Sequence, residues 1–233
     1  MTDLSGAIVL VTGANGGLGT EFVRQALDRG AAKVYATART PRDWDDARVV
    51  PLALDVTDEA SVAAVAQQAS DTTVVINNAG IGGTAPIATG DIALIRSIIE
   101  TNLFGAIHVA RAFAPVLAAN GGGALVDVHS VLSWVGFAGA YSASKAAFWS
   151  VTNSLRLELA PAGTHVVGLH LGYTDTPMTT DVTEPKNDPA DIVRLAYDGL
   201  EAGSLEVLAD EISVRVKQGL AAPVEALYPQ LAR

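Results

Sequence analysis

The chain of 233 residues contains no cysteine. Disulfide bonds and thiolate zinc sites are therefore excluded, although a lack of cysteine is compatible with either redox compartment. Basic residues are also scarce, at 15 against 25 acidic ones, and the formal net charge is −10. This charge repels nucleic acid and anionic membrane surfaces over most of the molecule, so we expect neither as a partner. A ligand that carries phosphate must then be captured by local features of the chain.

Low-complexity tracts, blocks of like charge and repeats of solenoid period are missing too. The stretch MTDLSGAIVLVTGANG at the start carries an acidic residue, no basic cluster and only a short apolar run. It is too brief for a membrane span, and we expect a soluble cytoplasmic protein. Apolar residues make up 49% of the chain, which is enough for a sizeable core. We predict a single domain over residues 1–233.

Short apolar stretches alternate with segments of helical periodicity along the whole chain. Strands are predicted near residues 7–13, 32–39, 49–56, 72–80, 123–130, 164–171 and 204–209, and helices near 19–30, 58–70, 92–119, 141–160 and 189–202. Apolar strands separated by helices indicate a Rossmann-type α/β fold, a doubly wound parallel sheet with helices on both faces. In such a fold, ligands bind outside the carboxyl ends of the strands.

The segment VTGANGGLG, residues 11–19, joins the first predicted strand to the first helix. Gly13, Gly17 and Gly19 lie where the backbone must turn tightly and approach a ligand. The amides at the start of the helix then face an anion, which makes this a candidate pyrophosphate site. The spacing Gly-x-x-x-Gly-x-Gly differs from the commoner dinucleotide fingerprint, but the strand before it and the helix after it favour a dinucleotide site over a simple tight turn.

The residues at the end of the second predicted strand indicate whether the cofactor is NAD or NADP. Ala38 occupies the position at which an acidic residue would bind the ribose of NAD, and Arg39 follows it, which favours the 2′-phosphate of NADP. NAD remains the alternative, since an arginine at a strand end is also an ordinary exposed residue. Asp55 and Asn77 end later strands, where they either bracket the adenine and ribose side of the crevice or cap loops.

Tyr141 and Lys145, in the segment GAYSASKAAF, stand four residues apart and share one face of a predicted helix. A nearby positive charge favours the phenolate and brings the tyrosine pKa closer to operating pH, which suits proton transfer. Taken alone, the pair fits a half-buried tyrosine and a solvated lysine better. The other motifs must decide between the two interpretations.

Four motifs in order, TGANGGLG, NNAG, YSASK and LGYTDTPM, resemble those of the short-chain dehydrogenase/reductase family over essentially the whole chain. The resemblance implies hydride exchange between a nicotinamide cofactor and a carbonyl or alcohol. In that scheme Tyr141 is the general acid or base, and Lys145 lowers the tyrosine pKa and binds the nicotinamide ribose. The Tyr141–Lys145 pair then has a catalytic interpretation.

The same resemblance assigns further residues. Ser130 matches the serine that polarises the carbonyl, with Ser133 as the fallback because the segment to Tyr141 is about two residues shorter than the family's usual one. Asn102 matches the helix-bending asparagine that holds a relay water, or is a helix cap. Cofactor contacts are implied for Asn15, Leu18, Val56, Ala79, Gly80, Gly172, Thr174 and Thr176, with Leu171 in place of the usual proline.

We therefore expect an NADP(H)-dependent oxidoreductase that acts on a small-molecule carbonyl or alcohol, needs no metal and forms a homodimer or homotetramer. The alternatives are an NAD-dependent alcohol dehydrogenase or an enoyl reductase or epimerase of the same family, and a non-catalytic dinucleotide-sensing protein. Trp134, Val135 and Phe137 favour an apolar substrate only weakly, since core packing explains them equally well. Residues 179–189 are polar and form either a mobile flap or a plain solvated loop.

The four histidines are poorly arranged for a metal site or a catalytic base. His165 and His170 lie five apart on one predicted strand and so face opposite sides, and His108 sits inside a helix without an adjacent ligand pattern. His129 points away from the site if Ser130 points into it, since strand neighbours face opposite ways.

Overall fold

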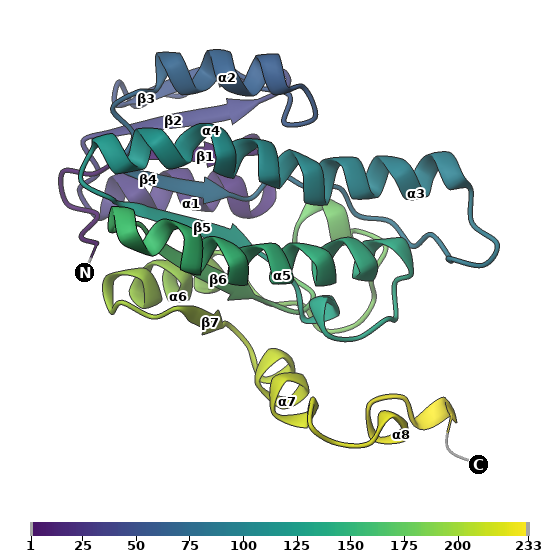
Figure 1. Cartoon of the computed structure of the whole chain (residues 1–233). Coiled ribbons are helices and arrows are strands. Elements are labelled where there is room, and N and C mark those ends of the chain that lie inside the picture. Colours follow the sequence, from purple (N-terminus) through teal and green to yellow (C-terminus); the bar gives the residue numbers. More distant parts are fainter. Residues whose placement is uncertain (1, 232–233) are drawn as a thin grey trace.

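The computed structural model describes residues 2–231, in which strands and helices alternate along the chain (Figure 1). All strands are parallel and join one seven-stranded sheet in the order β3-β2-β1-β4-β5-β6-β7. The strands are β1 (Ile8–Thr12), β2 (Lys33–Ala38), β3 (Val49–Ala53), β4 (Val74–Asn77), β5 (Ala124–Val128), β6 (His165–His170) and β7 (Glu206–Leu208). The order reverses between β1 and β4, and a ligand crevice is expected at their carboxyl ends.

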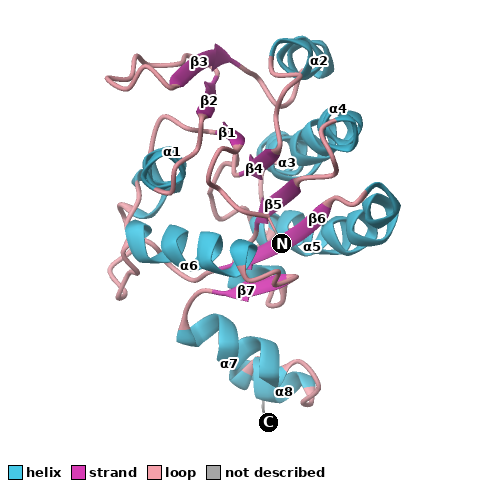
Figure 2. Ribbon diagram, turned by 90° about the vertical axis from the view of Figure 1, so that its left-hand side faces the viewer, coloured by secondary structure: helices cyan, strands magenta, loops and turns pink. Residues whose placement is uncertain are grey.

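Helices cover both faces of this sheet (Figure 2). One face carries α1 (Gly17–Asp28) and α6 (Pro189–Glu201), and the other carries α2 (Glu59–Gln68), α4 (Gly105–Ala119) and α5 (Ala140–Leu159). Each face has its own apolar core. Between α1 and α6, the Tyr197 ring meets Phe22 edge-on at 5.4 Å, and the Tyr197 hydroxyl donates to the Phe22 carbonyl over 2.8 Å. The Rossmann-type fold predicted from the sequence is confirmed.

The predicted helix over 92–119 is one continuous rod, but it is not regular. It consists of α3 (Ile92–Ile99), a π-helical turn (Glu100–Phe104) and α4. The rod has a mean hydropathy of 1.3, which passes the length and composition test for a membrane span, as core helices of soluble proteins also do. Here α4 packs on β4 and α2 within the fold. Single π turns inside helices occur frequently at functional sites.

Several elements were not predicted. Two helices follow β7, namely α7 (Glu211–Gly219) and α8 (Val224–Leu227), which lie below the last strand in Figure 1. Short 3₁₀ turns cover Val131–Ser133, Ala160–Ala162, Pro177–Thr179 and Pro229–Leu231. The turn Val131–Ser133 directly follows Ser130, and it therefore fixes the path of the chain at a candidate catalytic residue.

Aspartate side chains cap four of the helices. Asp58, Asp91, Asp188 and Asp210 each accept a hydrogen bond from a backbone amide in the first turn of α2, α3, α6 and α7. Such caps contribute about 1 kcal/mol each. Helix α1 differs, because it begins after Gly16 with no side-chain cap and no acidic residue in its first turn. Its amide dipoles are left for an anion from outside the chain.

Candidate active site

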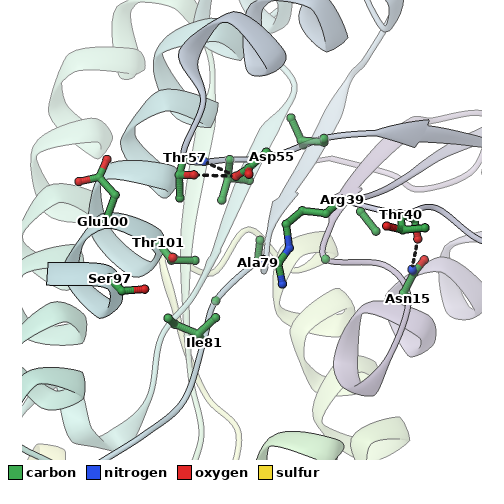
Figure 3. A pocket seen from close by; sticks show the side chains of 15 residues that line it. Asn15, Arg39, Thr40, Asp55, Thr57, Ala79, Ile81, Ser97, Glu100 and Thr101 are labelled. Carbon is green, nitrogen blue, oxygen red and sulfur yellow. Dashed lines mark hydrogen bonds between the residues drawn. The ribbon is translucent and has the colours of Figure 1, made fainter. Parts of the chain in front are cut away.

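A cleft of about 560 Å³ opens at the carboxyl ends of β1, β2 and β4 (Figure 3). Seven of the predicted cofactor residues line it, namely Gly13, Asn15, Arg39, Asp55, Val56, Ala79 and Gly80. The sequence did not predict the opposite wall, which is formed by Ile81, by Ser97 of α3 and by Glu100 and Thr101 of the π-helical turn. Nothing in the local sequence pattern signals that wall, since it depends on how the rod packs beside β4.

The glycine loop fits the close approach of a dinucleotide. Gly13 and Gly17 adopt left-handed φ values of 68° and 52°, which disfavour any side chain. A Cβ on Gly19 would lie 2.1 Å from the Gly13 carbonyl oxygen, so only glycine lets α1 pack this tightly on the loop. A Cβ on Gly13 would lie 3.1 Å from the Ala79 Cα. Together with the uncapped start of α1, this cradle suits a pyrophosphate.

Asn15 and Arg39 shape the end of the cleft next to β2. The Asn15 amide donates to the Thr40 carbonyl over 2.6 Å and so ties the glycine loop to the loop after β2. Arg39 is exposed and points toward the cleft between Asn15 and Asp55 (Figure 3). No ion pair engages Arg39 within residues 2–231. Its guanidinium is thus available to an anionic ligand.

Asp55 lies on the opposite side of this part of the cleft. Its carboxylate accepts hydrogen bonds from the Thr57 hydroxyl at 2.7 Å and the Thr57 amide at 2.9 Å (Figure 3). These bonds, with a smaller contribution from the charge of Arg39, hold the pKa of Asp55 below its usual value. Asp55 is therefore a fixed negative acceptor at neutral pH.

Asn77, predicted as a cofactor contact or a loop cap, is the last residue of β4. Its side chain is buried beneath the cleft and donates to the Ala106 carbonyl and to Asp127, both over 3.1 Å. The turn after β4 is instead held by Thr12, whose hydroxyl accepts from the amides of Asn78 and Ala79, each over 2.9 Å. Thr12 was missed because its role depends on the pairing of β1 with β4.

The segment after β6 reaches the glycine loop, as the motif LGYTDTPM implied. A Cβ on Gly17 would lie 3.1 Å from the Thr176 Cγ2 atom, so Thr176 sits directly on the loop. Gly172 and Thr174 make structural bonds, since the Gly172 amide donates to Asp210 and the Thr174 hydroxyl donates to the Gly172 carbonyl. The side chain of Leu18 is partly buried and packs against the apolar core.

Tyr141 and Lys145 lie on the first turns of α5. The start of this helix is fixed by an isolated β-bridge between Gly139 and Ala85. Gly139 has a φ of 54°, and a Cβ there would lie 2.2 Å from the Ala85 carbonyl oxygen. The Lys145 ammonium lies 5.9 Å from the centre of the Tyr141 ring and donates over 2.8 Å to the carbonyl oxygen of Val128, at the end of β5. The structure thus brings both side chains to the carboxyl edge of the sheet.

The expected lowering of the tyrosine pKa by Lys145 is not found in the protein alone. Burial raises the pKa of Tyr141 to about 12, and a hydrogen bond with Ser130 opposes this shift. Burial also lowers the pKa of Lys145 to about 8, against the charge of Asp127. The sequence argument considered the charge of the lysine and not the loss of water around both groups. Without ligands, Tyr141 is therefore a protonated phenol at neutral pH.

Of the two candidate serines, Ser130 is the one beside the phenol. Ser130 precedes the turn Val131–Ser133, its hydroxyl accepts from the Leu132 amide over 3.1 Å, and it is the serine that opposes the rise in the pKa of Tyr141. Ser133 is buried, and its hydroxyl makes no hydrogen bond in the described part of the chain. The geometry favours Ser130 over the fallback.

Asn102 lies inside the π-helical turn and is not a helix cap. Its buried amide donates to the Ile81 carbonyl over 3.0 Å and to the Ser144 hydroxyl over 3.2 Å, and its oxygen accepts from the Ile81 amide over 2.8 Å. It therefore joins the rod, the loop after β4 and the helix of Tyr141. Ser144 had not been singled out, although it stands beside Lys145 in the sequence.

A second buried polar cluster lies behind Lys145. The Asp127 carboxylate accepts from the Thr152 hydroxyl over 2.6 Å, and that hydroxyl lies 3.0 Å from His129 Nε2. Burial raises the pKa of Asp127 to about 6 and lowers that of His129 well below its usual value. Asp127 lies in β5, His129 directly after it and Thr152 in α5, so only their proximity in space reveals the cluster.

The other histidines serve structural contacts. The His108 Nδ1 atom lies 3.0 Å from the Val56 carbonyl, and the His165 Nε2 atom lies 3.0 Å from the Ser204 carbonyl. The rings of His129 and His170 stack at 4.8 Å, a proximity that the sequence did not predict. Across residues 2–231, no group of three or more histidine, aspartate or glutamate side chains could hold a metal ion.

Residues 179–189, predicted as a mobile flap or a solvated loop, are held by hydrogen bonds near their C-terminal end. Asn187 forms a bridge with Thr174, and its side chain donates to the Tyr173 carbonyl over 3.0 Å and to Asp210 over 2.7 Å. At its near end, Met178 packs on the loop after β4, because a Cβ on Gly82 would lie 2.6 Å from its Cγ atom. The segment is thus preceded by a contact with the loop after β4 and ends in contacts with Tyr173 and Asp210.

The doubly wound sheet, the anion-ready start of α1 and the grouping of a phenol, an ammonium and a hydroxyl define the class of dinucleotide-binding oxidoreductases. A family model described as short chain dehydrogenase matches residues 7–187. The chain therefore belongs to the short-chain dehydrogenase family, as its motifs implied.

Individual relatives agree with this assignment. An NADPH-dependent 1-acyldihydroxyacetone phosphate reductase of Schizosaccharomyces pombe is 38% identical over 72% of this chain, and the match spans 60% of that protein. Ketoacyl reductase HetN of a Nostoc species is 30% identical over 91% of this chain and 81% of its own. The crystal structure of a Burkholderia cenocepacia short chain dehydrogenase in complex with NADP is 38% identical, with a TM-score of 0.93 over 99% of this chain and all of that one.

Proposed function

We propose that the protein is an NADP(H)-dependent oxidoreductase that reduces the carbonyl group of a small molecule to an alcohol, or catalyses the reverse reaction. The observation that carries this proposal is the meeting of Ser130, Tyr141 and Lys145 at the sheet edge beside the cleft that Arg39 borders. A protein that only sensed dinucleotides would not need this set of three groups.

Tyr141 is assigned the role of general acid. The bound cofactor supplies a hydride to the carbonyl carbon. Tyr141 donates its proton to the carbonyl oxygen, which yields the alcohol and leaves a phenolate, while the Ser130 hydroxyl donates a hydrogen bond to the same oxygen. A pKa of about 12 in the protein alone keeps the phenol protonated and ready to donate. In the oxidation direction, the Tyr141 phenolate takes the proton from the alcohol.

Lys145 and Asn102 are assigned supporting roles. The ammonium of Lys145 stabilises the phenolate that forms and donates to the nicotinamide ribose. With a pKa of about 8 it is mostly protonated at neutral pH but able to pass a proton to the phenolate afterwards. Asn102 and its π-helical turn hold the loop after β4 beside α5, and we assign to this turn the water through which the lysine regains its proton.

The cofactor preference rests on Arg39. The amides at the start of α1 would hold the pyrophosphate, and Arg39 would pair with the 2′-phosphate, since Ala38 offers no carboxylate to a free ribose. Asp55 and Val56, which line the cleft, would border the adenine side, and Thr176, beside Gly17, would contact the carboxamide. The NADP complex of the Burkholderia relative and the NADPH-dependent yeast reductase support this preference.

The substrate is assigned only as a small carbonyl compound or alcohol. Two relatives are named as reductases of acyl-bearing ketones, which makes such ketones the first compounds to test. Trp134 and Val135, which were considered as an apolar substrate wall, pack inward, with Trp134 stacked on His170 at 4.1 Å. Phe137 alone of the three is 54% exposed.

We also propose a homo-oligomer that buries the outer faces of α5 and of the rod around α4. Leu157 on α5 is 79% exposed and Phe104, just before α4, is 44% exposed, so both faces offer apolar surface to a second copy. Leu157→Glu would dissociate such an assembly, and light scattering after gel filtration measures its mass. A wild-type monomer would refute this part of the proposal.

The experiment that tests the function has two stages. The purified protein is first titrated with NADPH and NADH while tryptophan fluorescence or heat is recorded, which needs no substrate. A panel of acyl ketones, cyclic ketones and aldehydes is then assayed at 340 nm with the cofactor that binds better. Tighter NADPH binding with turnover of a panel member supports the proposal. Tighter NADH binding reassigns the cofactor, and binding of neither favours a non-catalytic role.

A further inference from the structure

Helix α7 is fastened to the core through a cage around Lys217. The Lys217 ammonium lies 4.9 Å from the ring centres of both Trp134 and Trp149 and 2.8 Å from Glu206 Oε2. The two indole rings meet edge-on at 6.1 Å, and the Trp149 indole N–H lies 3.4 Å from Glu206 Oε1. Two aromatic faces and a carboxylate around one ammonium form a specific attachment, stronger than an exposed ion pair.

The cage continues inward to the catalytic loop. The Trp134 ring stacks on His170 at 4.1 Å with an angle of 17° between the planes. The fully buried His170 places Nδ1 3.4 Å from the Ser130 carbonyl oxygen and Nε2 3.4 Å from Glu206 Oε1. The contact between His170 Nε2 and Glu206 is not aligned as a hydrogen bond, but it places the ring against the carboxylate. Contacts with His170 and Lys217 hold the pKa of Glu206 at about 2.

The backbone of the loop that these groups support is hydrogen-bonded. The Val131 amide donates to the Leu171 carbonyl and the Leu132 amide to the Ser130 hydroxyl. The amides of Ser133 and Trp134 donate to the carbonyls of Ser130 and Val131. The Ser133 hydroxyl and the Trp134 indole N–H have no partner in the described structure. The side chains behind the loop are thus held by packing, and the contact of His170 with the Ser130 carbonyl connects that packing to the backbone of Ser130.

We propose that Glu206 and Lys217 are positioning residues for Ser130: they clamp Trp134 and His170 against the catalytic loop, so that α7 completes the active site without touching the substrate. The inference rests on the proposed carbonyl chemistry, in which the Ser130 hydroxyl meets the substrate oxygen. A displacement of about 1 Å at such a group is sufficient to lower turnover by up to about 100-fold.

The chain provides a matched control at the opposite end of the sheet. Lys33 lies 4.9 Å from the ring centre of Tyr35 and pairs with Asp71, and its side chain is 32% exposed against 30% for Lys217. Lys217→Met and Lys33→Met therefore remove the same kind of aromatic and ionic contact at similar exposure. Only the first removes a contact connected to Ser130.

We expect Lys217→Met and Glu206→Gln to lower kcat about 10-fold or more and to leave the Kd for NADPH unchanged. Lys217→Arg should retain most of the wild-type kcat. Lys33→Met should have the kcat of wild type. In a Ser130→Ala background, Lys217→Met should have less than a twofold further effect, because the group that it positions is gone. Equal losses in both backgrounds would overturn the inference, because they would mean that Lys217 acts independently of Ser130.

Hydrogen exchange of the peptide over residues 130–134 tests the positioning without any substrate. We expect Lys217→Met to speed its exchange by at least threefold and Lys33→Met to leave it unchanged. Unchanged exchange in Lys217→Met overturns the inference even if the enzyme is active. If exchange is faster in Lys217→Met but the wild-type protein reduces no carbonyl, the clamp on Ser130 stands and only the proposed function is overturned.

Discussion

Lys145 donates a 2.8 Å hydrogen bond to the carbonyl oxygen of Val128, so the end of β5 determines where its ammonium lies. The charge is thereby fixed near the Tyr141 ring but does not lower the pKa of the phenol in the protein alone. Acid catalysis by Tyr141 then needs no phenolate in the resting state. The ammonium becomes important when the proton has left and a negative oxygen must be stabilised in a dry site.

Tyr141→Phe should remove most of the turnover and preserve the binding of cofactor. The substitution deletes the phenolic proton donor, and general acid catalysis contributes about 10²–10⁴-fold. Steady-state rates at 340 nm and a fluorescence titration with NADPH measure the two effects. Tyr173→Phe is the control, since Tyr173 is exposed and lies outside the proposed chemistry. Turnover above a tenth of wild type in Tyr141→Phe would contradict the assignment.

Arg39→Ala should weaken NADPH about 10–100-fold and NADH less than twofold, because only the 2′-phosphate needs the guanidinium. Isothermal titrations with both cofactors measure the ratio. Arg48→Ala provides the comparison, since Arg48 is also an exposed arginine but pairs with Asp46 and does not line the cleft. If both cofactors lost affinity equally in Arg39→Ala, the residue would have no role in the choice between them.

Asp127→Asn should stabilise the protein near neutral pH and have little effect in acid. Burial raises the folded-state pKa of Asp127 to about 6 from a usual 3.8, so the folded state binds this proton more tightly than the unfolded state. The stabilisation from that proton is complete below about pH 3.8 and is lost as the pH rises through 6. The loss amounts to roughly 1–3 kcal/mol of unfolding free energy.

Urea unfolding of wild type and Asp127→Asn at pH 4 and pH 7 measures this difference, since other carboxyl groups titrate alike in both proteins. The gap between the two unfolding free energies should widen from pH 4 to pH 7. Thr152→Val is informative as well, because it removes the 2.6 Å bond to the carboxylate and should destabilise the protein most at pH 7. Parallel pH profiles for wild type and Asp127→Asn would exclude a titration of Asp127 in this range.

The sequence predicted the features that depend on residues close together in the chain. The glycine loop, the alternation of strands and helices and the Tyr141–Lys145 pair are local patterns, and the structure places them as expected. The features that it missed depend on contacts between distant segments. Asp127 meets Thr152 across 25 residues, and Lys217 meets Trp134 only after the chain has passed through β6, α6 and β7.

Two predictions considered strand ends and charges but not burial. The sequence placed Asn77 beside the crevice or in a loop cap, and it predicted that the charge of Lys145 lowers the pKa of Tyr141, whereas both side chains are buried in the protein alone. Burial reverses the balance in both cases: it directs the Asn77 amide to Asp127, and it disfavours the charged phenolate. The effect of burial on a polar group requires knowledge of the tertiary neighbours.

Gly19→Ala and Gly16→Ala form a pair that tests the glycine loop itself. The new Cβ would lie 2.1 Å from the Gly13 carbonyl oxygen in the first case and would meet nothing within 4 Å in the second. Gly16 has an extended backbone with φ of −164°, which alanine adopts without strain. Gly19→Ala must therefore push α1 away from the loop, and we expect it to cost about 1–3 kcal/mol of stability and at least tenfold in NADPH affinity.

Gly16→Ala should keep the affinity within about threefold, because the amides of α1 stay in place and only the weak preference for glycine at the cap position is lost. Thermal unfolding and NADPH titration of both variants measure the comparison. A Gly19→Ala protein that bound NADPH as tightly as Gly16→Ala would mean that the close packing of α1 on the loop does not create the phosphate site. The uncapped amides of α1 would then have to bind the cofactor in an arrangement that does not depend on this close packing.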